Sequence, residues 1–118
     1  MLRGVQPRGP TMGPDSMALL EAAKALNGKV FSLPRIQLLG VLNQYHPEGI
    51  EFRELKAALG MGDGKLLSNL YALRDMQLVK SEDVKVENQV RTSYTITTEG
   101  QDAWRKASSW LKQWLEVT

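Results

Sequence analysis

Apolar residues recur every three or four positions in the first half of the chain, which is the spacing of a helix with one buried side. One helix is expected over residues 15–28, with Asp15 or Ser16 as its cap and Asn27-Gly28 at its end. The apolar stripe of this helix comprises Leu19, Leu20, Ala23 and Leu26.

A second helix is expected over residues 32–46, with Ser32 as its cap and Pro34 in its first turn. The stretch HPEG follows as a turn. An extended entry at residues 50–52 then leads into a brief helix, which Gly60 ends.

A further helix is expected from near Gly62 to about Met76. Leucines stand on it at positions i, i+4 and i+7, so they must share one face and point into the core. These core residues are Leu66, Leu70 and Leu73.

Beyond Met76 the apolar period falls to two, which is typical of strands. Apolar and polar residues alternate from Val79 to Val86 and again from Val90. The two runs meet near residues 87–89, so they predict a β-hairpin whose turn length the sequence leaves open. A long final helix follows, with Thr98 as its expected cap.

The predicted order is helix, helix, short strand, helix, helix, hairpin, helix. This order describes a winged helix-turn-helix with extra N- and C-terminal helices, a mainly α fold with a small β-hairpin (α+β). The 118 residues suffice for one domain. We expect a flexible tail over residues 1–14, which are rich in Gly and Pro, and the domain over residues 15–118.

Composition excludes several classes of protein. The chain has no cysteine and a single histidine, so disulfides are excluded and neither a metal site nor a cofactor is expected. No nucleophile and base stand in a recognisable catalytic pattern, so we do not expect an enzyme. No apolar run reaches the roughly 20 residues that span a bilayer, and the N-terminus does not resemble a secretory signal. We therefore expect a cytoplasmic protein without a membrane partner.

The net charge of +2 comes from the N-terminal part of the chain. Residues 1–31 contain four Lys or Arg and two Asp or Glu, which leaves 15 − 4 = 11 basic and 13 − 2 = 11 acidic residues in the remainder. Any nucleic-acid surface must therefore come from the local placement of basic side chains, because the bulk charge of the main body is zero.

The stretch GMGDGKLLSNL, residues 60–70, has two possible interpretations. A nucleotide phosphate loop needs a preceding strand and the pattern G-x-x-x-x-G-K-[ST]. Here the glycine spacing is one residue too short, Leu66 follows Lys65 where a hydroxyl is needed, and the preceding element is a helix. The NTPase interpretation is rejected on these grounds.

The second interpretation is a helix that begins at this stretch and meets a DNA phosphate. Gly60 can end one helix, and Gly62 can cap the next. Gly64 lies in the first turn, where a missing side chain lets another backbone approach the positive end of the helix. The glycines alone favour a simpler explanation, a tight turn between two packed helices.

The face of this helix opposite the leucines carries polar side chains that suit phosphate and base-edge contacts. A solvated surface would look similar. This face comprises Lys65, Ser68, Tyr71, Ala72 and Asp75, with Asn69 at its border.

The stretches FRELKAALGMGDGKLLSNLYALRDMQLV and VRTSYTITTEGQDAW resemble the small winged-helix transcriptional regulators related to the MarR and ArsR groups. The shared features are Asp63-Gly64 at the helix start, Arg91-Thr92 leaving the wing, the strand end 94–97 and Glu99-Gly100 opening the last helix. The resemblance implies a winged-helix regulator of transcription that binds double-stranded DNA as a homodimer.

The resemblance also implies a recognition helix in the major groove and a wing on the backbone or minor groove. This chain departs from the family pattern at Gly62, Asn69 and Gln77, where the family often has threonine, histidine and glycine. The expected DNA contacts are Gly64, Lys65, Ser68, Asn69, Tyr71, Ala72, Lys85, Asn88, Gln89, Arg91 and Thr92.

Three tryptophans on the last helix suggest a dimer interface, because large aromatic side chains concentrate binding energy there. The alternative is that these rings pack on the first helix of the same chain. The expected interface comprises Leu19, Leu20, Ala23, Leu26, Trp104, Trp110, Leu111, Trp114 and Leu115.

A second hypothesis is a protein-interaction module that does not bind DNA. The neutral main body and the acidic residues of the wing favour it: Glu82, Asp83 and Glu87. A small-molecule effector is possible in the groove between the core and the last helix, but no polar constellation in the sequence supports one.

Overall fold

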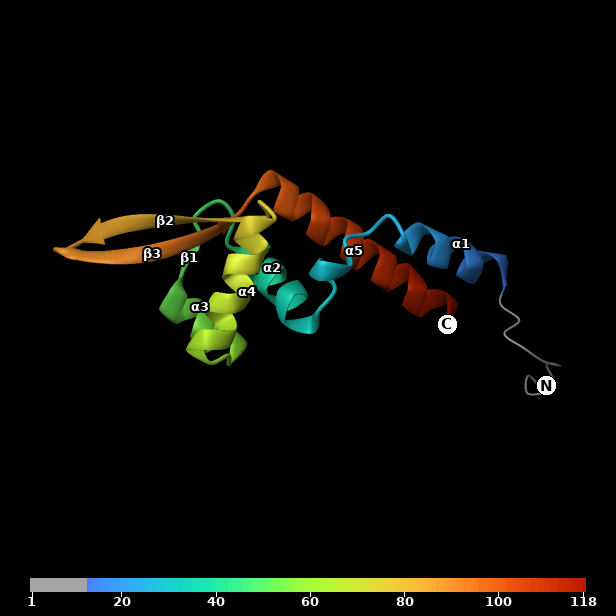
Figure 1. Cartoon of the computed structure of the whole chain (residues 1–118), viewed down its shortest axis with the longest axis horizontal. Helices are drawn as coiled ribbons and strands as arrows, with labels where there is room; N and C mark the ends of the chain where they lie inside the picture. Colours follow the sequence, from blue (N-terminus) through green and yellow to red (C-terminus); the bar gives the residue numbers. More distant parts are fainter. Residues whose placement is uncertain (1–12) are drawn as a thin grey trace.

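The computed structural model describes residues 13–118. The predicted tail over residues 1–14 lies outside the described residues apart from its last two positions, and Pro14 already begins the first helix. The elements in chain order are α1 Pro14–Ala23, the 3₁₀ turn η2 Gly28–Val30, α2 Leu33–Gln44, β1 Ile50–Glu51, α3 Phe52–Leu59, α4 Asp63–Asp75, β2 Val79–Val86, β3 Gln89–Ile96 and α5 Thr98–Val117 (Figure 1).

The predicted winged helix-turn-helix with added terminal helices is confirmed. The three strands form an antiparallel sheet in the order β1-β3-β2, with Ile50 opposite Tyr94 and Val79 opposite Ile96. The hairpin turn, whose length the sequence left open, consists of two residues, Glu87 and Asn88. Both have a positive φ, at 50° and 68°, which matches the tight hairpin turns that follow the twist of the strands.

The core lies between α2, α3, α4 and the base of the hairpin. The three leucines predicted for the inner face of α4 are buried, with at most 1% of each residue exposed. Their periodicity was therefore a sufficient signal for the orientation of this helix. The core comprises Val30, Leu38, Leu39, Leu42, Ile50, Leu55, Met61, Leu66, Leu70, Leu73, Leu78, Val79, Tyr94 and Ile96.

The first helix is shorter than predicted, because α1 ends at Ala23 and not at residues 27–28. Its N-cap is Gly13, which offers no side chain, so the predicted cap at Asp15 or Ser16 is wrong. The Asn27 side chain accepts a hydrogen bond from the Lys29 amide at 3.0 Å and so caps η2. An asparagine that captures a nearby backbone amide in this way competes with the helix, which is why the pattern overestimated its length.

The cap of the last helix is Thr97, one residue before the predicted Thr98. The Thr97 hydroxyl accepts a hydrogen bond from the Gly100 amide at 2.9 Å and donates one to the Gln77 carbonyl at 2.7 Å. Gln77 itself has φ 63°, so this chain places glutamine in a left-handed position that favours glycine. The two hydrogen bonds of Thr97 fasten the start of α5 to the base of the hairpin.

Gly100 lets α5 approach the hairpin base closely. A methyl group at this position would overlap the Leu78 carbonyl oxygen and the Ile96 side chain. The Thr97 amide also donates to the Leu78 carbonyl at 3.0 Å, which holds this carbonyl in place. Gly64, in the first turn of α4, has no atom within 4 Å of the corresponding position.

The molecule is elongated, with a radius of gyration of 18.5 Å, against about 13 Å for a compact chain of about 100 residues. In Figure 1 the hairpin projects from one end, while α1 and the last part of α5 lie side by side at the other. We call α1 together with residues 108–117 of α5 the arm. The arm contains no buried residue. Within residues 13–118, no helix combines the length and apolar character needed to cross a bilayer.

We expect Gly100→Ala to lower the free energy of unfolding by about 3 kcal/mol, because the added methyl group overlaps a fixed backbone carbonyl. Gly64→Ala is the matched control in the first turn of another helix. It should leave the free energy unchanged or raise it by about 0.5 kcal/mol. Urea unfolding followed by circular dichroism measures both, and equal effects of the two substitutions would contradict the assigned contact.

Candidate nucleic-acid interface

The N-terminal end of α4 is exposed and free of side-chain caps. Gly60 ends α3 in a left-handed conformation with φ 64°, and Gly62 forms an extended N-cap that lacks a capping side chain. The first amides of α4 are therefore open to an external acceptor, and the helix dipole makes this end positive. Both glycine roles predicted from the sequence are confirmed.

The acidic residue at this helix end is neutralised by a neighbour. Lys56 of α3 forms an ion pair with Asp63 at 2.6 Å. The carboxylate therefore repels an approaching phosphate less than the sequence alone indicates. This role of Lys56 could not be predicted from the sequence, because nothing in the pattern specifies which lysine the turn brings to Asp63.

The predicted contacts on α4 share an outward face only in part. Gly64, Lys65, Ser68 and Tyr71 are exposed, whereas Ala72 is half-buried. Lys65 forms no ion pair among residues 13–118. A free ammonium group beside open helix amides is an arrangement that suits a phosphate oxygen.

Asn69 is engaged within the chain. Its Oδ1 accepts a hydrogen bond from Arg35 Nε at 3.0 Å, and its Nδ2 donates one to the Lys65 carbonyl at 2.9 Å. The residue is half-buried. A contact between Asn69 and a base stays a prediction, and it requires at least one of these two hydrogen bonds to be given up.

The predicted wing residues lie on both faces of the ribbon. Residues directly opposite each other in the ladder share a face, and faces alternate along a strand. Lys85 therefore shares a face with Thr92, which lies opposite Asp83, while Gln89 and Arg91 occupy the other face. Asn88 lies in the turn between them.

Two of these wing residues have acidic partners. Arg91 lies 3.6 Å from the Glu51 carboxylate, and the Thr92 hydroxyl donates to Asp83 at 3.0 Å. The structure thus leaves Lys85 as the one basic wing candidate without an ion pair among the described residues. The ribbon register that separates these residues could not be deduced until the turn length was known.

Arg74 is a further cation on α4 that sequence analysis did not select. Its guanidinium lies over the Tyr71 ring, 4.8 Å from the centroid. Residues three positions apart on a helix are neighbours, so the sequence spacing of Tyr71 and Arg74 could have predicted this contact.

Burial raises the pKa of the Tyr94 phenol, which lies near these two side chains. Tyr71 and Asp83 raise this pKa further, while Arg74 lowers it.

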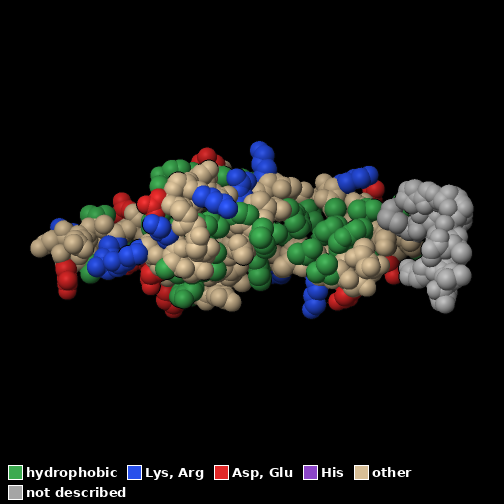
Figure 2. Space-filling model, turned by 90° about the horizontal axis from the view of Figure 1, so that it is seen from below, with side chains coloured by type: hydrophobic (Ala, Val, Ile, Leu, Met, Phe, Trp, Pro, Cys, Tyr) green, Lys and Arg blue, Asp and Glu red, His purple; other side chains and the backbone are tan. Residues whose placement is uncertain are grey.

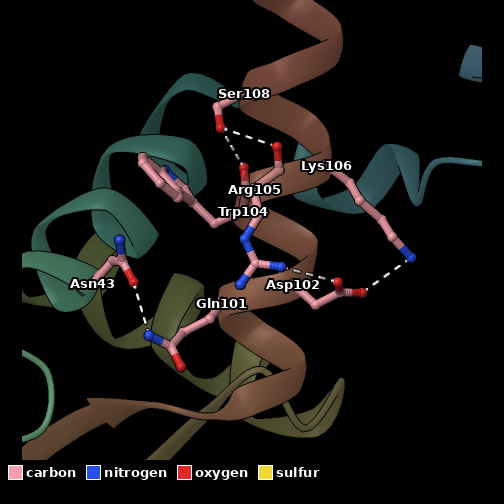
Figure 3. Close-up of polar contacts among 7 residues, drawn as sticks. All are labelled: Asn43, Gln101, Asp102, Trp104, Arg105, Lys106 and Ser108. Carbon is pink, nitrogen blue, oxygen red and sulfur yellow. Dashed lines mark hydrogen bonds and ion pairs between the residues drawn. The ribbon is translucent and has the colours of Figure 1, made fainter.

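The tryptophans of α5 pack largely within their own chain. Trp110 Nε1 donates to the Leu19 carbonyl of α1 at 2.7 Å, and Trp114 stacks on Trp110 with ring centroids 5.5 Å apart. Figure 3 shows the Trp104 ring against α2. Its Nε1 would lie 3.3 Å from a Cβ atom at Gly40, so the missing side chain there makes room for the ring. Beside it, Gln101 donates to Asn43 at 3.1 Å, which adds a polar contact between the same two helices.

Several other residues predicted for the dimer interface are partly exposed to solvent. Leu20 and Leu111 are each 37% exposed, and Leu115 is 67% exposed, whereas Leu19, Ala23 and Leu26 are half-buried. Figure 2 shows hydrophobic side chains gathered over the half of the molecule that carries the arm. The residues predicted for the dimer interface therefore fall into two groups. The tryptophans pack within the chain, and the exposed leucines face outward.

Few features suggest bound metals or ligands. Residues 13–118 hold no group of three or more His, Asp or Glu side chains placed to bind a metal ion. A cavity of about 290 Å³ lies between residues 25–31 and α5, with mostly apolar walls. Its polar lining includes Glu99, Asp102 and Lys106, and Lys106 pairs with Asp102 at 3.0 Å.

A family model described as winged helix DNA-binding domain matches residues 35–115. Among curated proteins, no sequence matches this chain. A solved structure of a MepR mutant from S. aureus bound to an oligodeoxyribonucleotide is similar, with 16% identity and a TM-score of 0.65. The similarity covers 86% of this chain and 73% of that one.

Two further solved structures are similar. The PcaV transcriptional regulator from Streptomyces coelicolor, in complex with its natural ligand, has 16% identity and a TM-score of 0.63 over 86% of this chain and 69% of that one. A transcriptional regulator homologue from Pyrococcus horikoshii OT3 has 23% identity and a TM-score of 0.68 over 85% of this chain and 96% of that one. At these identities the similarities show a shared fold.

The raised pKa of Tyr94 predicts a loss of stability in alkali. The unfolded chain loses the phenol proton near pH 10, while the folded chain retains it to a higher pH. The contribution of Tyr94 is therefore constant below about pH 9 and falls as the pH rises above about 10. Urea unfolding between neutral and alkaline pH should show a smaller alkaline loss for Tyr94→Phe than for the wild type. Identical profiles would refute this assignment.

Proposed function

The chain belongs to the winged helix DNA-binding domain family, and on that basis we propose that it is a homodimeric regulator of transcription. In the proposed complex, α4 enters the major groove and the wing touches the adjacent backbone or minor groove. The observation that carries the proposal is the uncapped, exposed N-terminus of α4 beside Lys65, which forms no ion pair within residues 13–118.

The shape of α4 suits this role. An α-helix with its side chains is about 10–12 Å across, and the major groove is about 12 Å wide. The buried leucines turn Lys65 and Ser68 outward, and these side chains suit phosphate oxygens and base edges. The similar MepR structure with bound oligodeoxyribonucleotide supports the same use of this fold.

The wing carries as many acidic as basic side chains, because Glu82, Asp83 and Glu87 offset its three Lys and Arg residues. Lys85 and Asn88 are the wing residues that we assign to the DNA backbone, since Arg91 is already near Glu51. The acidic side chains of the ribbon limit its affinity for phosphate. On α4 the uncapped helix N-terminus adds its positive end to Lys65, so we assign most of the electrostatic contact to α4 and a supporting contact to the wing.

The arm supplies the proposed dimer interface. Trp110 of α5 packs edge to face on Phe31, just after η2, at 5.9 Å, and its hydrogen bond to the Leu19 carbonyl joins α5 to α1 within one chain. The outward leucines of the arm remain for a second copy. Burying one large apolar side chain contributes about 1.5–3 kcal/mol. Several such residues from each copy offset an association cost of about 4–15 kcal/mol.

Lys65→Ala should weaken duplex binding and reduce its salt dependence. Each lost phosphate contact lowers the slope of log K against log salt by about 0.9, and a dimer loses two. Arg91→Ala should have the smaller effect because Arg91 already has an acidic partner. Fluorescence anisotropy on a duplex selected from a random pool, over a range of salt concentrations, measures these values.

Lys106→Ala is the matched control, because it removes the same charge from α5, where Lys106 pairs with Asp102. It should leave the salt slope unchanged. If the wild type binds no duplex at micromolar concentration in low salt, DNA binding is rejected. The protein-interaction hypothesis is then favoured if a bound partner is lost on the Lys65 substitution.

Leu115→Glu should convert the dimer into monomers, because it places a charge in the proposed interface. The control is Val90→Glu on the wing, since Val90 and Leu115 are 68% and 67% exposed. Sedimentation velocity at tens of micromolar should show a dimer for the wild type and the control. A monomeric wild type would contradict the proposed assembly and leave the leucines as ordinary surface residues.

A further inference from the structure

Arg35 connects three elements through one guanidinium group. It lies in the first turn of α2, and its Nη1 donates to the Lys29 carbonyl of η2 at 2.8 Å. Its Nε donates to Asn69 Oδ1 on α4 at 3.0 Å. Asn69 Nδ2 extends the chain of hydrogen bonds to the Lys65 carbonyl at 2.9 Å. A continuous polar path therefore runs from η2 to the backbone of Lys65.

The segment that Arg35 holds leads directly to the arm. Residues 27–31, which we call the linker, stand between α1 and α2 and contain η2. The linker touches α4 at a second place, where Asn27 Nδ2 lies 3.4 Å from Met76 Sδ at the C-terminal end of the helix. The linker is thus tied to the middle of α4 through Arg35 and to its end through Asn27.

We propose that Arg35 is a positioning residue that fixes α4 relative to the linker, and so relative to the arm. This inference rests on the proposed function, in which the arm joins two copies and α4 of each copy enters DNA. The spacing of the two recognition helices then depends on how rigidly each is joined to its arm. Arg35 adds a connection through the linker to the one that α5 makes as a continuous helix, and it does so without touching DNA itself.

The chemistry of the side chain supports this role. The guanidinium plane holds its donors in fixed directions, so one side chain can hold acceptors on two separate elements. Lysine has one nitrogen on a flexible stem and cannot reproduce both donors in one plane. Arg35→Lys therefore keeps the charge and removes the geometry, which separates positioning from electrostatic attraction.

A double-mutant cycle tests the inference in duplex binding. We expect Arg35→Lys and Asn69→Ala each to weaken the affinity of the folded protein by about tenfold, and the double variant no further. The salt slope should match the wild type in all three, because no phosphate contact is lost. The control is Arg105→Lys, at an exposed arginine of α5, which should bind as the wild type does.

Three outcomes of this cycle would overturn the inference. Wild-type affinity in Arg35→Lys would show that the geometry is unnecessary. If the losses of affinity in the two single variants multiplied in the double variant, Arg35 and Asn69 would act separately. A weakening by Asn69→Ala alone would show that Asn69 contacts a base directly. In the first of these outcomes, a lower thermal stability of Arg35→Lys would identify a purely structural role.

Hydrogen exchange tests the same connection without DNA. In the linker, the Val30 amide donates to the Asn27 carbonyl at 3.0 Å and the Phe31 amide to the Gly28 carbonyl at 3.2 Å. We expect Asn69→Ala to speed exchange at these amides by about tenfold, although Asn69 contacts neither of them. Unchanged exchange would overturn the inference even if the wild type binds DNA. Faster exchange in a protein that binds no duplex would retain the connection and reject only the proposed function.

Discussion

The burial of one side of α4 is the constraint on which the rest of the structure depends. Leu66, Leu70 and Leu73 lie against the core at 0–1% exposure. Their burial fixes the rotation of the helix, so the residues between them must face solvent or neighbouring elements. This rotation turns Lys65 outward and places Asn69 beside Arg35 of α2, which holds it by a hydrogen bond. The open helix N-terminus has a separate cause, the glycines that precede α4.

The arm is stabilised differently from the core, by contacts between partly exposed side chains. A helix with no buried residue gains little from its own chain, and α1 is held mainly by contacts with the rings of α5. Trp110 supplies a polar and an apolar contact at once, through its hydrogen bond to Leu19 and its edge-to-face contact with Phe31. The compact domain and the arm are joined by the continuous helix α5 and by the linker, where Asn27 contacts the end of α4 and Arg35 of α2 binds the Lys29 carbonyl.

Much of the fold could be predicted from the sequence, because its signals are local. The leucine spacing of α4, the helix end at Gly60 and the alternating strands each depend on a few adjacent residues. The site was less predictable, because its contacts join distant residues. Arg35 meets Asn69 across 34 positions, and Trp110 meets Leu19 across 91. One-residue errors, such as Thr98 for Thr97, arise because both hydroxyls suit the cap and tertiary contacts decide between them.

The central claim is that two copies of α4 enter one duplex together, positioned by the arms. Hydroxyl-radical footprinting of the wild-type protein on its selected duplex tests this claim most directly. The account predicts two protected patches, related by two-fold symmetry and separated by about 10 base pairs or a multiple of that spacing. A single protected patch at saturating protein, with no symmetric counterpart, would contradict it.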